Sequence, residues 1–359
     1  MNFNAFFLKS FRVLLLPFAL LYGLAVTIRN YLYNKKYLRS AEFALPLICV
    51  GNVAVGGTGK SPMVEYLVKL LKNRYKIATL SRGYKRKTKG YALAGAGSTA
   101  LDIGDEPMQF HLKFPDITVA VGEERLVAIP QLLHDRPDTQ VILLDDAFQH
   151  RPVNAGLNIM LTDYSNLFTR DYFLPTGDLR DQRSSYKRAH VIVVTKCPAT
   201  LSTEERDALL AEIHPLPAQQ VYFTTMEYGT PYHIANHTAY TLSQEEEVLL
   251  VCGIANPKPL KHYLTEQVAS YSLLDYNDHH IFSIDDLKDI RKKYEQLTGN
   301  RKIILTTEKD AVRLLKFKQE LDTLPLYVLP VRHGFLFNGA DQFNRQMIHF
   351  IENYQLHTA

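Results

Sequence analysis

One short segment carries the residue types and spacing that can hold a phosphate group. Its residues are Ala54, Val55, Gly56, Gly57, Thr58, Gly59, Lys60 and Ser61. Glycines allow successive backbone N–H groups to turn toward phosphate oxygens, and a following helix adds the positive end of its dipole. In such a loop Lys60 contacts the β- and γ-phosphates and Ser61 binds Mg²⁺. The segment therefore predicts a nucleotide-binding loop. A glycine-rich turn without a nucleotide is the competing interpretation, because Ala54 stands where the usual pattern has glycine.

Two carboxylates are placed to assist that loop. The apolar run 141–144 ends in Asp145 and Asp146. In nucleotide-binding α/β folds, a strand of this kind presents a Mg²⁺-holding aspartate opposite the lysine and serine of the loop. Both residues are therefore candidate metal ligands, and the sequence does not decide between them.

Apolar, β-rich runs recur along the first two-thirds of the chain, separated by stretches long enough for helices. They lie at residues 47–50, 77–80, 117–121, 141–144, 159–161, 191–194 and 221–223. The alternation predicts an α/β fold of the P-loop kinase type, with a mainly parallel sheet flanked by helices. Further runs at 248–251 and 302–305 predict a second, smaller α/β domain. The expected divisions are an N-terminal membrane-associated helix at 1–38, the nucleotide-binding domain at 39–225, and the smaller domain with its β linker at 226–359.

The N-terminal helix is expected to contact a membrane. Residues 13–28 include no charged side chain, and basic residues such as Lys9, Arg12, Arg29 and Lys35 lie on both sides. As a helix this run covers roughly 24 Å, less than the roughly 30 Å of a hydrocarbon core. We therefore expect it to be embedded in, or to lie against, an anionic membrane surface, and the sequence leaves open whether it spans. A buried core helix and a cleaved signal peptide are the alternatives. A nucleotide-binding loop about 25 residues downstream argues against the signal peptide.

Composition narrows the class of protein. The 359 residues are 46% hydrophobic and 22% charged, which is typical of a globular enzyme. A net charge of +4 is too small to indicate a nucleic-acid partner. Cys49, Cys197 and Cys252 are widely spaced and form no C-x-x-C motif, which argues against a zinc site and a disulfide framework.

Five further motifs support a family resemblance. They are Ser-Arg-Gly-Tyr at 81–84, Gly-Asp-Glu-Pro at 104–107, Asp-Asp-Ala-Phe-Gln-His at 145–150, Asp-His-His at 278–280 and Thr-Glu-Lys-Asp at 307–310. In this order behind an apolar N-terminal helix, they resemble the tetraacyldisaccharide 4'-kinase family of lipid A biosynthesis over nearly the whole chain. That family accepts alanine at the first loop position, which accounts for Ala54.

The resemblance implies a reaction and a place in the cell. The expected reaction is transfer of the γ-phosphoryl group of ATP, with Mg²⁺, to the 4'-hydroxyl of a tetraacyl glucosamine disaccharide 1-phosphate. The expected place is the cytoplasmic face of the bacterial inner membrane. The family's smaller domain is joined by β-strands and moves toward the nucleotide.

The resemblance also assigns roles to single residues. Asp105 would be the catalytic base and His279 its partner from the other domain, a pairing suited to deprotonating a sugar hydroxyl. Without the resemblance, Asp105 would be interpreted as a helix N-cap and His279 as an ordinary loop histidine. Independently of the resemblance, Arg82, in a basic run after the second strand, and Arg125, at another strand end, are candidate ligands of the substrate phosphate. A solvated loop and surface ion pairing are the respective alternatives. Asp181 stands where the family usually has Glu, which weakens the case for a role at the metal.

Two other functions compete with a lipid kinase. One is a membrane-associated P-loop ATPase that acts as a switch or scaffold, and the other is a nucleotide sensor without catalysis. A GTPase would need Asn-Lys-x-Asp after a late strand, whereas residues 195–198 read Thr-Lys-Cys-Pro, which favours adenine. The sequence does not give the oligomeric state.

Overall fold

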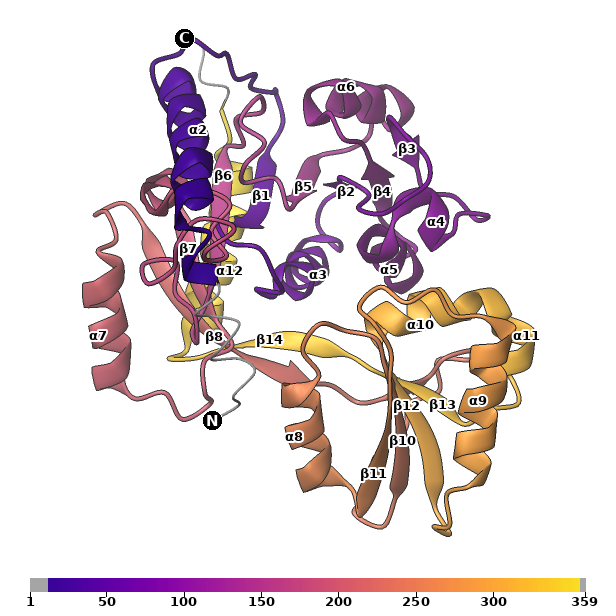
Figure 1. The fold of residues 1–359 in the computed structure, drawn as a ribbon. Helices are drawn as coiled ribbons and strands as arrows, with labels where there is room; N and C mark the ends of the chain where they lie inside the picture. Colours follow the sequence, from indigo (N-terminus) through magenta and orange to yellow (C-terminus); the bar gives the residue numbers. More distant parts are fainter. Residues whose placement is uncertain (1–11, 356–359) are drawn as a thin grey trace.

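The computed structural model describes residues 12–355, and most of its strands form one large sheet (Figure 1). These strands are β1 (Leu47–Asn52), β2 (Ile77–Ser81), β3 (Ala92–Leu93), β4 (Thr118–Val121), β5 (Val141–Asp145), β6 (Leu157–Asp163), β7 (Val191–Thr195), β8 (Gln220–Tyr228) and β14 (Val331–Phe335). Their order is β14-β8-β7-β6-β1-β5-β2-β4-β3. Pairs from β8 across to β4 are parallel, and β14 and β3 add antiparallel edges. Strands β1, β2, β5 and β7 are buried along their whole length, as expected where helices cover both faces.

Helices cover this sheet on its two faces. They are α3 (Lys60–Leu71), α4 (Ala100–Ile103), α5 (Asp105–Lys113), α6 (Arg125–Asp135), the 3₁₀ helix η1 (Arg183–Arg188), α7 (Thr203–Ile213) and α12 (Gly339–Glu352). Met63, Phe110 and Phe343 place α3, α5 and α12 in one core, against one face of β1. Ile129 and Ile213 place α6 and α7 in the core on the opposite face. The prediction of a mainly parallel sheet flanked by helices is confirmed.

A second, smaller sheet follows β8 in the chain. Its strands are β9 (Tyr232–His233), β10 (Glu247–Cys252), β11 (Ser270–Asp275), β12 (Lys302–Thr307) and β13 (Leu326–Leu329), in the order β11-β10-β12-β13-β9. Its helices are α8 (Lys258–Gln267), α9 (Ile284–Glu295), α10 (Glu308–Leu314), the 3₁₀ helix η2 (Leu315–Phe317) and α11 (Lys318–Leu321). Leu260 packs α8 on one face, and Ile290 and Leu314 pack α9 and α10 on the other. This sheet is parallel except for β9.

Strands β8 and β14 join the two sheets as an antiparallel ribbon, with Tyr228 opposite Val331. After β14 the chain returns, and α12 packs Phe343 and Met347 into the core of the larger sheet. The prediction that everything from residue 226 onward belongs to the smaller domain therefore does not hold for 331–352, because pairing between distant segments leaves no local signal in a sequence. We propose that the chain forms a larger unit, with a smaller unit inserted between β8 and β14.

The N-terminal helix α2 (Leu16–Asn34) packs on the larger unit by only part of its surface, and its buried residues are Ala19, Gly23 and Asn30. Gly23 lies against Phe173, where an added Cβ would come within 2.7 Å of the ring, so this glycine permits close approach. Elsewhere the helix exposes large apolar side chains, among them Phe18, Leu20, Leu21 and Leu24. No described helix is both long and apolar enough to cross a bilayer. Residues 1–11, with Lys9, lie outside the described part of the chain.

Candidate active site

The predicted phosphate-binding loop connects the buried strand β1 to helix α3. Gly56 and Gly59 have φ of 105° and 85°, a region that favours glycine, so the loop depends on glycine at both positions. Val55, Gly56 and Gly57 are exposed, and no atom of the described chain beyond the adjacent residues lies within 4 Å of the position that a Cβ would take at Gly56 or Gly57. The Val55 N–H donates to the Asp178 carbonyl oxygen at 2.7 Å. Thr58 is buried and accepts a hydrogen bond from Asn52 Nδ2 at 2.9 Å. The loop is therefore anchored at its base and open at its tip.

A histidine from the linker supports this loop. His333, on β14, donates from Nε2 to the carbonyl oxygen of Gly59 at 2.9 Å, and Nδ1 accepts from the Thr224 hydroxyl at 2.9 Å. These two partners fit the neutral ring. Burial lowers the pKa of His333 to about 4. This contact was not predicted, since a histidine on a strand has no distinguishing sequence pattern.

We expect the burial of His333 to lower the free energy of unfolding in acid. The unfolded chain binds a proton at His333 below its ordinary pKa of 6.5, whereas the folded protein resists protonation until about 4. Its contribution is therefore complete above 6.5 and is lost as the pH falls toward 4. At about pH 5 we expect the parent to have lost about 2 kcal/mol more of its unfolding free energy than His333→Gln, relative to neutral pH. Urea unfolding of both proteins at the two pH values tests this, and equal losses would contradict it.

The two carboxylates after β5 have different surroundings. Asp145 is 6% exposed, and its carboxylate accepts from the Ser81 hydroxyl at 3.2 Å. Burial, together with the charge of Asp146, raises the pKa of Asp145 to about 6. Asp146 lies 3.7 Å from Lys60 Nζ and accepts from Arg180 Nη1 at 3.1 Å. Burial acts to raise the pKa of Asp146, but the charges of Lys60 and Arg180 outweigh it and hold the pKa below its usual value.

These oxygen donors suit a magnesium ion. A serine hydroxyl at the start of α3 and carboxylates at the end of β5 are the hard ligands that Mg²⁺ prefers. Repulsion between Asp145 and Asp146 would also be offset by a divalent cation. Within residues 12–355 no group of three or more His, Cys, Asp or Glu side chains could hold a metal alone. The remaining ligands of Mg²⁺ at such a site would therefore be phosphate oxygens and water.

The pair Asp105 and His279 meets across the boundary between the units. His279 Nδ1 lies 2.8 Å from Asp105 Oδ2, and the imidazole ring packs edge-on to Tyr84. His279 has φ of 65°, an uncommon conformation for a residue other than glycine, and such strain gathers at functional sites. Asp105 is the first residue of α5, and the N-cap position is held by Gly104, without a side-chain cap. The alternative interpretation of Asp105 as an N-cap is therefore wrong.

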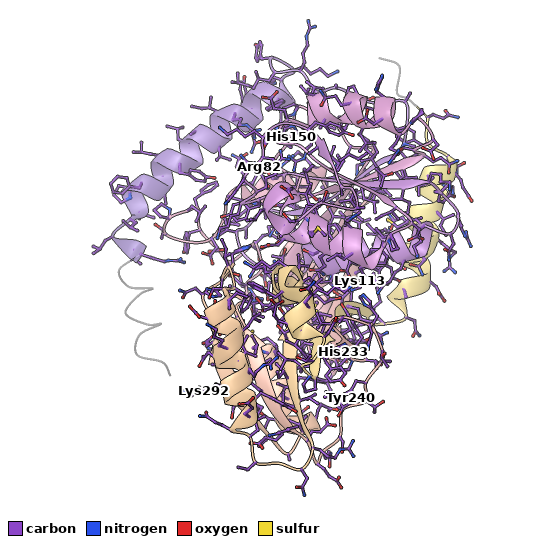
Figure 2. The ribbon with its side chains drawn as sticks, turned by 90° about the vertical axis from the view of Figure 1, so that its right-hand side faces the viewer. Arg82, Lys113, His150, His233, Tyr240 and Lys292 are labelled. Carbon is purple, nitrogen blue, oxygen red and sulfur yellow. The ribbon has the colours of Figure 1, made fainter. Side chains whose placement is uncertain are left out.

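The candidate phosphate ligands Arg82 and Arg125 differ in exposure. Arg82 is exposed, whereas Arg125 is 2% exposed and donates to the carbonyl oxygens of Gly122 and Glu123 at 2.8 and 3.0 Å. Arg82 and His150 lie near each other in the larger unit (Figure 2). Burial, together with the charges of Arg125, Arg29 and Arg82, lowers the pKa of His150 to about 4. The region is therefore electropositive, and phosphate binding by either arginine stays a prediction.

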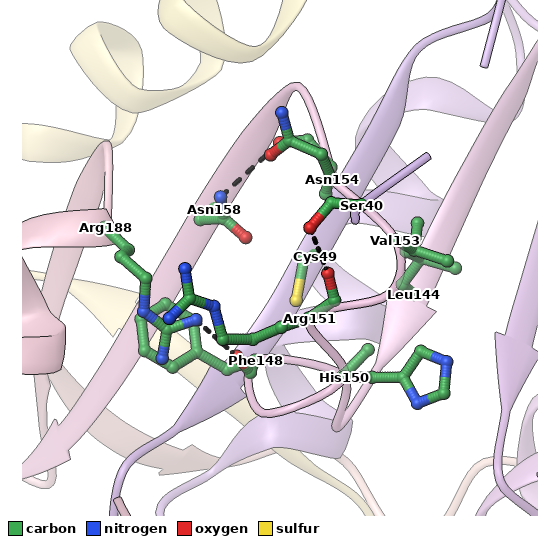
Figure 3. A pocket seen from close by; sticks show the side chains of 12 residues that line it. Ser40, Cys49, Leu144, Phe148, His150, Arg151, Val153, Asn154, Asn158 and Arg188 are labelled. Atoms are coloured by element: carbon green, nitrogen blue, oxygen red, sulfur yellow. Dashed lines mark hydrogen bonds between the residues drawn. The ribbon is translucent and has the colours of Figure 1, made fainter. Parts of the chain in front are cut away.

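A small cavity lies beneath the loop that follows Asp146 (Figure 3). Its volume is about 70 Å³, far below the roughly 300 Å³ at which ligand pockets begin. Arg188 lies on the Phe148 ring and donates to the Phe148 carbonyl oxygen at 2.9 Å, while His150 extends away on the other side. This cavity is therefore too small to hold a nucleotide.

Sequence reasoning assigned no role to two arginines of this region. Arg180 bonds Asn52 Oδ1 at 2.5 Å as well as Asp146. Its neighbour Asp181 accepts from Asn30 Nδ2 at 2.8 Å and from Arg188 at 2.7 Å, and so joins α2 to the larger unit. Arg313, on α10, donates to Asp105 Oδ2 at 2.7 Å. Arg180 precedes Asp181, the only residue of that segment to which the sequence analysis gave attention. No sequence pattern distinguishes Arg313.

A phosphate loop between a central parallel strand and a helix, facing two strand-end carboxylates, defines the class of P-loop phosphotransferases and NTPases. Within that class, the model of the LpxK family, described as tetraacyldisaccharide-1-P 4'-kinase, matches residues 11–352. The chain belongs to this family.

Relatives with this description come from several bacteria. A tetraacyldisaccharide 4'-kinase of Flavobacterium johnsoniae is 45% identical over 95% of this chain and 97% of its own. Another from Bacteroides thetaiotaomicron is 42% identical over 94% and 92%. A crystal structure of LpxK from Aquifex aeolicus in complex with ATP has a TM-score of 0.74 at 25% identity, and covers 95% of this chain and 99% of that chain.

Proposed function

We propose that this protein transfers the γ-phosphoryl group of ATP to the 4'-hydroxyl of a tetraacyl glucosamine disaccharide 1-phosphate in lipid A biosynthesis. The observation that carries the proposal is the 2.8 Å contact between Asp105 and His279, because it joins a candidate base to its partner across the two units. A nucleotide switch or sensor has no need of such a pair. Membership of the LpxK family supports the substrate class.

The proposed mechanism uses the described residues in three places. The loop N–H groups and Lys60 bind and orient the β- and γ-phosphates. Asp105 accepts the proton of the 4'-hydroxyl. At the same time the hydroxyl oxygen forms a bond to the γ-phosphorus, and the bond between this phosphorus and the ADP oxygen breaks. His279 holds the Asp105 carboxylate in place. Because these groups come from both units, closure with substrate would complete the site and limit transfer to water.

Mg²⁺ is part of this proposal. Ser61 and Asp145 would hold it, and its charge would neutralise the phosphate oxygens during transfer. Asp145 suits this role better than Asp146, because Arg180 and Lys60 already pair with Asp146. Arg180 would keep Asp146 turned toward Lys60.

The electropositive region around Arg82 and Arg125 would receive the phosphate of the acceptor lipid. Arg29, from α2, contributes to it by donating to the Gln149 carbonyl oxygen at 3.0 Å. This links the predicted phosphate site to the N-terminal helix. The arrangement supports a substrate that keeps its acyl chains in a membrane while its sugar reaches the loop.

We further propose that α2 rests on the cytoplasmic face of the bacterial inner membrane. Leu20 and Leu24 are 65% and 57% exposed on neighbouring turns, and apolar side chains gathered in this way mark an interaction surface. Arg29 and Lys35 would meet anionic headgroups.

Removing apolar area from α2 should weaken membrane binding. The double change Leu20→Ser and Leu24→Ser should reduce binding to vesicles of phosphatidylglycerol and phosphatidylethanolamine by at least roughly tenfold, because two leucines lose their burial in lipid. The matched control changes Leu126 and Val127 of α6, which are 43% and 50% exposed, to serine. Co-sedimentation measures all three proteins. Equal binding by the α2 variant and the parent would exclude this face.

The proposed reaction has a direct test. The purified protein is incubated with γ-labelled ATP, Mg²⁺ and the tetraacyl disaccharide 1-phosphate in detergent, and label in the lipid is measured. We expect a labelled bisphosphate lipid, with ATP turnover dependent on the lipid. ATP turnover without labelled lipid would instead favour the ATPase switch.

A further inference from the structure

Helices α5 and α10 face each other across the boundary between the units (Figure 1). Three ion pairs join them: Arg313 with Asp105, Lys309 with Glu106 at 2.7 Å, and Glu308 with Lys113. The residue numbers run in opposite directions, so the helices are antiparallel. Lys113 is labelled at this boundary in Figure 2. The candidate base Asp105 therefore lies at one end of a row of three ion pairs between the units.

Arg313 contacts both members of the pair at that end. Its Nε and Nη2 atoms lie 3.0 and 2.7 Å from Asp105 Oδ2, and Nη2 lies 3.1 Å from His279 Nδ1. Its side chain is 6% exposed. On the other side, Nη1 donates to Asp310 Oδ1 at 3.3 Å, and Asp310 accepts from the Gly253 N–H at 3.0 Å. Asp310 thus fixes the guanidinium on the side opposite Asp105.

The two oxygens of Asp105 have unequal surroundings. Oδ2 receives every hydrogen bond made to this carboxylate by the described residues, two from Arg313 and one from His279. Oδ1 receives none from residues 12–355. Since a planar guanidinium fork restricts rotation of a carboxylate, Oδ1 is held as a fixed, open acceptor.

From this asymmetry we infer that Arg313 is a positioning residue of phosphoryl transfer. It holds Oδ2 of Asp105 from the smaller unit, so that Oδ1 takes the proton of the substrate hydroxyl. The inference rests on the proposed function, and it couples the base to the closed arrangement of the units. In that arrangement the proton moves from the hydroxyl to Oδ1, the hydroxyl oxygen bonds to phosphorus, and ADP leaves.

Arg313 also affects the charge of the base. Burial acts to raise the pKa of Asp105, but the hydrogen bonds and charge of Arg313, followed by those of His279, outweigh it and lower the pKa below its usual value. A neutral side chain at position 313 should therefore shift the acidic limb of the kcat–pH profile upward. A residue needed only for packing between the units would not move that limb.

The test compares three full-length variants in the lipid phosphorylation assay. Arg313→Gln should lower kcat by roughly 10- to 100-fold, with little change in the KM for ATP and with its acidic limb raised. Arg313→Lys keeps the charge but loses the fork, so it should retain the parent's acidic limb at an intermediate kcat. The control Lys309→Gln removes an ion pair from the same helix without touching Asp105, and should keep kcat within a factor of about three.

The outcomes separate the inference from the function on which it rests. An active parent whose Arg313→Gln variant matches Lys309→Gln in kcat and acidic limb would overturn the inference alone. If Arg313→Gln fails to fold, Arg313→Lys decides, because parental kcat in that variant would show that the fork is dispensable. A parent that labels no lipid would overturn the proposed function and the inference together.

Discussion

Asp105→Asn should lower kcat by roughly 10²- to 10⁴-fold, the usual effect of losing a positioned base. Asparagine keeps the size of the side chain and an oxygen for Arg313, but it cannot accept a proton from the sugar hydroxyl. Because Asp105 lies in α5 and not in the phosphate loop, the KM for ATP should change little. Initial rates of lipid labelling at saturating ATP measure this effect.

The control for Asp105→Asn is Glu106→Gln. Glu106 is the next residue of the same turn and pairs with Lys309 at 2.7 Å, so its loss removes a carboxylate and an inter-unit ion pair while leaving Asp105 intact. A much smaller fall in kcat is expected. If Asp105→Asn kept more than about a tenth of the parental kcat, Asp105 would be reduced to a structural partner of Arg313.

Lys60→Met should lower kcat by roughly 10²- to 10³-fold and raise the KM for ATP, because a charge facing the transferring phosphate is lost. Methionine retains much of the apolar stem of lysine. The fold should survive, since Asp146 would still be paired with Arg180. The measurement is lipid phosphorylation over a range of ATP concentrations, with thermal unfolding as a check on the fold.

Lys69→Met is the matched control on the same helix. Lys69 lies near the end of α3 and is exposed, so it is remote from the loop at the helix start. We expect near-parental rates. Comparable losses in the two variants would mean that α3 is sensitive to charge in general, and that Lys60 has no special place at the phosphates.

Local sequence patterns predicted the parts of this protein that are encoded locally. The loop from Ala54 to Ser61 follows a buried strand and opens a helix, as its glycines and apolar flanks require. The apolar run 141–144 predicted a buried strand, and the charged residues Asp145 and Asp146 predicted its end. The pairing of Asp105 with His279 came from motif resemblance, since no periodicity relates residues so far apart in the chain.

Contacts made by tertiary packing left no such pattern. Arg313 occupies a short helix where an arginine would ordinarily be solvated, but its side chain is buried where α10 meets α5 and pairs with Asp105. His333 reaches the Gly59 carbonyl oxygen because β14 pairs with β8. Strand propensity does not predict which strands pair with each other. The end of the smaller unit was misplaced for the same reason.

The return of the chain through β14 and α12 also bears on the order in which the protein is made. Phe343 and Met347 of α12 belong to the same core as Met63 of the phosphate-loop helix. During synthesis from the N-terminus, the inserted smaller unit leaves the ribosome before these residues do, and it can fold first. The core beneath the phosphate loop is finished only by α12, so a growing chain does not complete this core until residues 339–352 have left the ribosome.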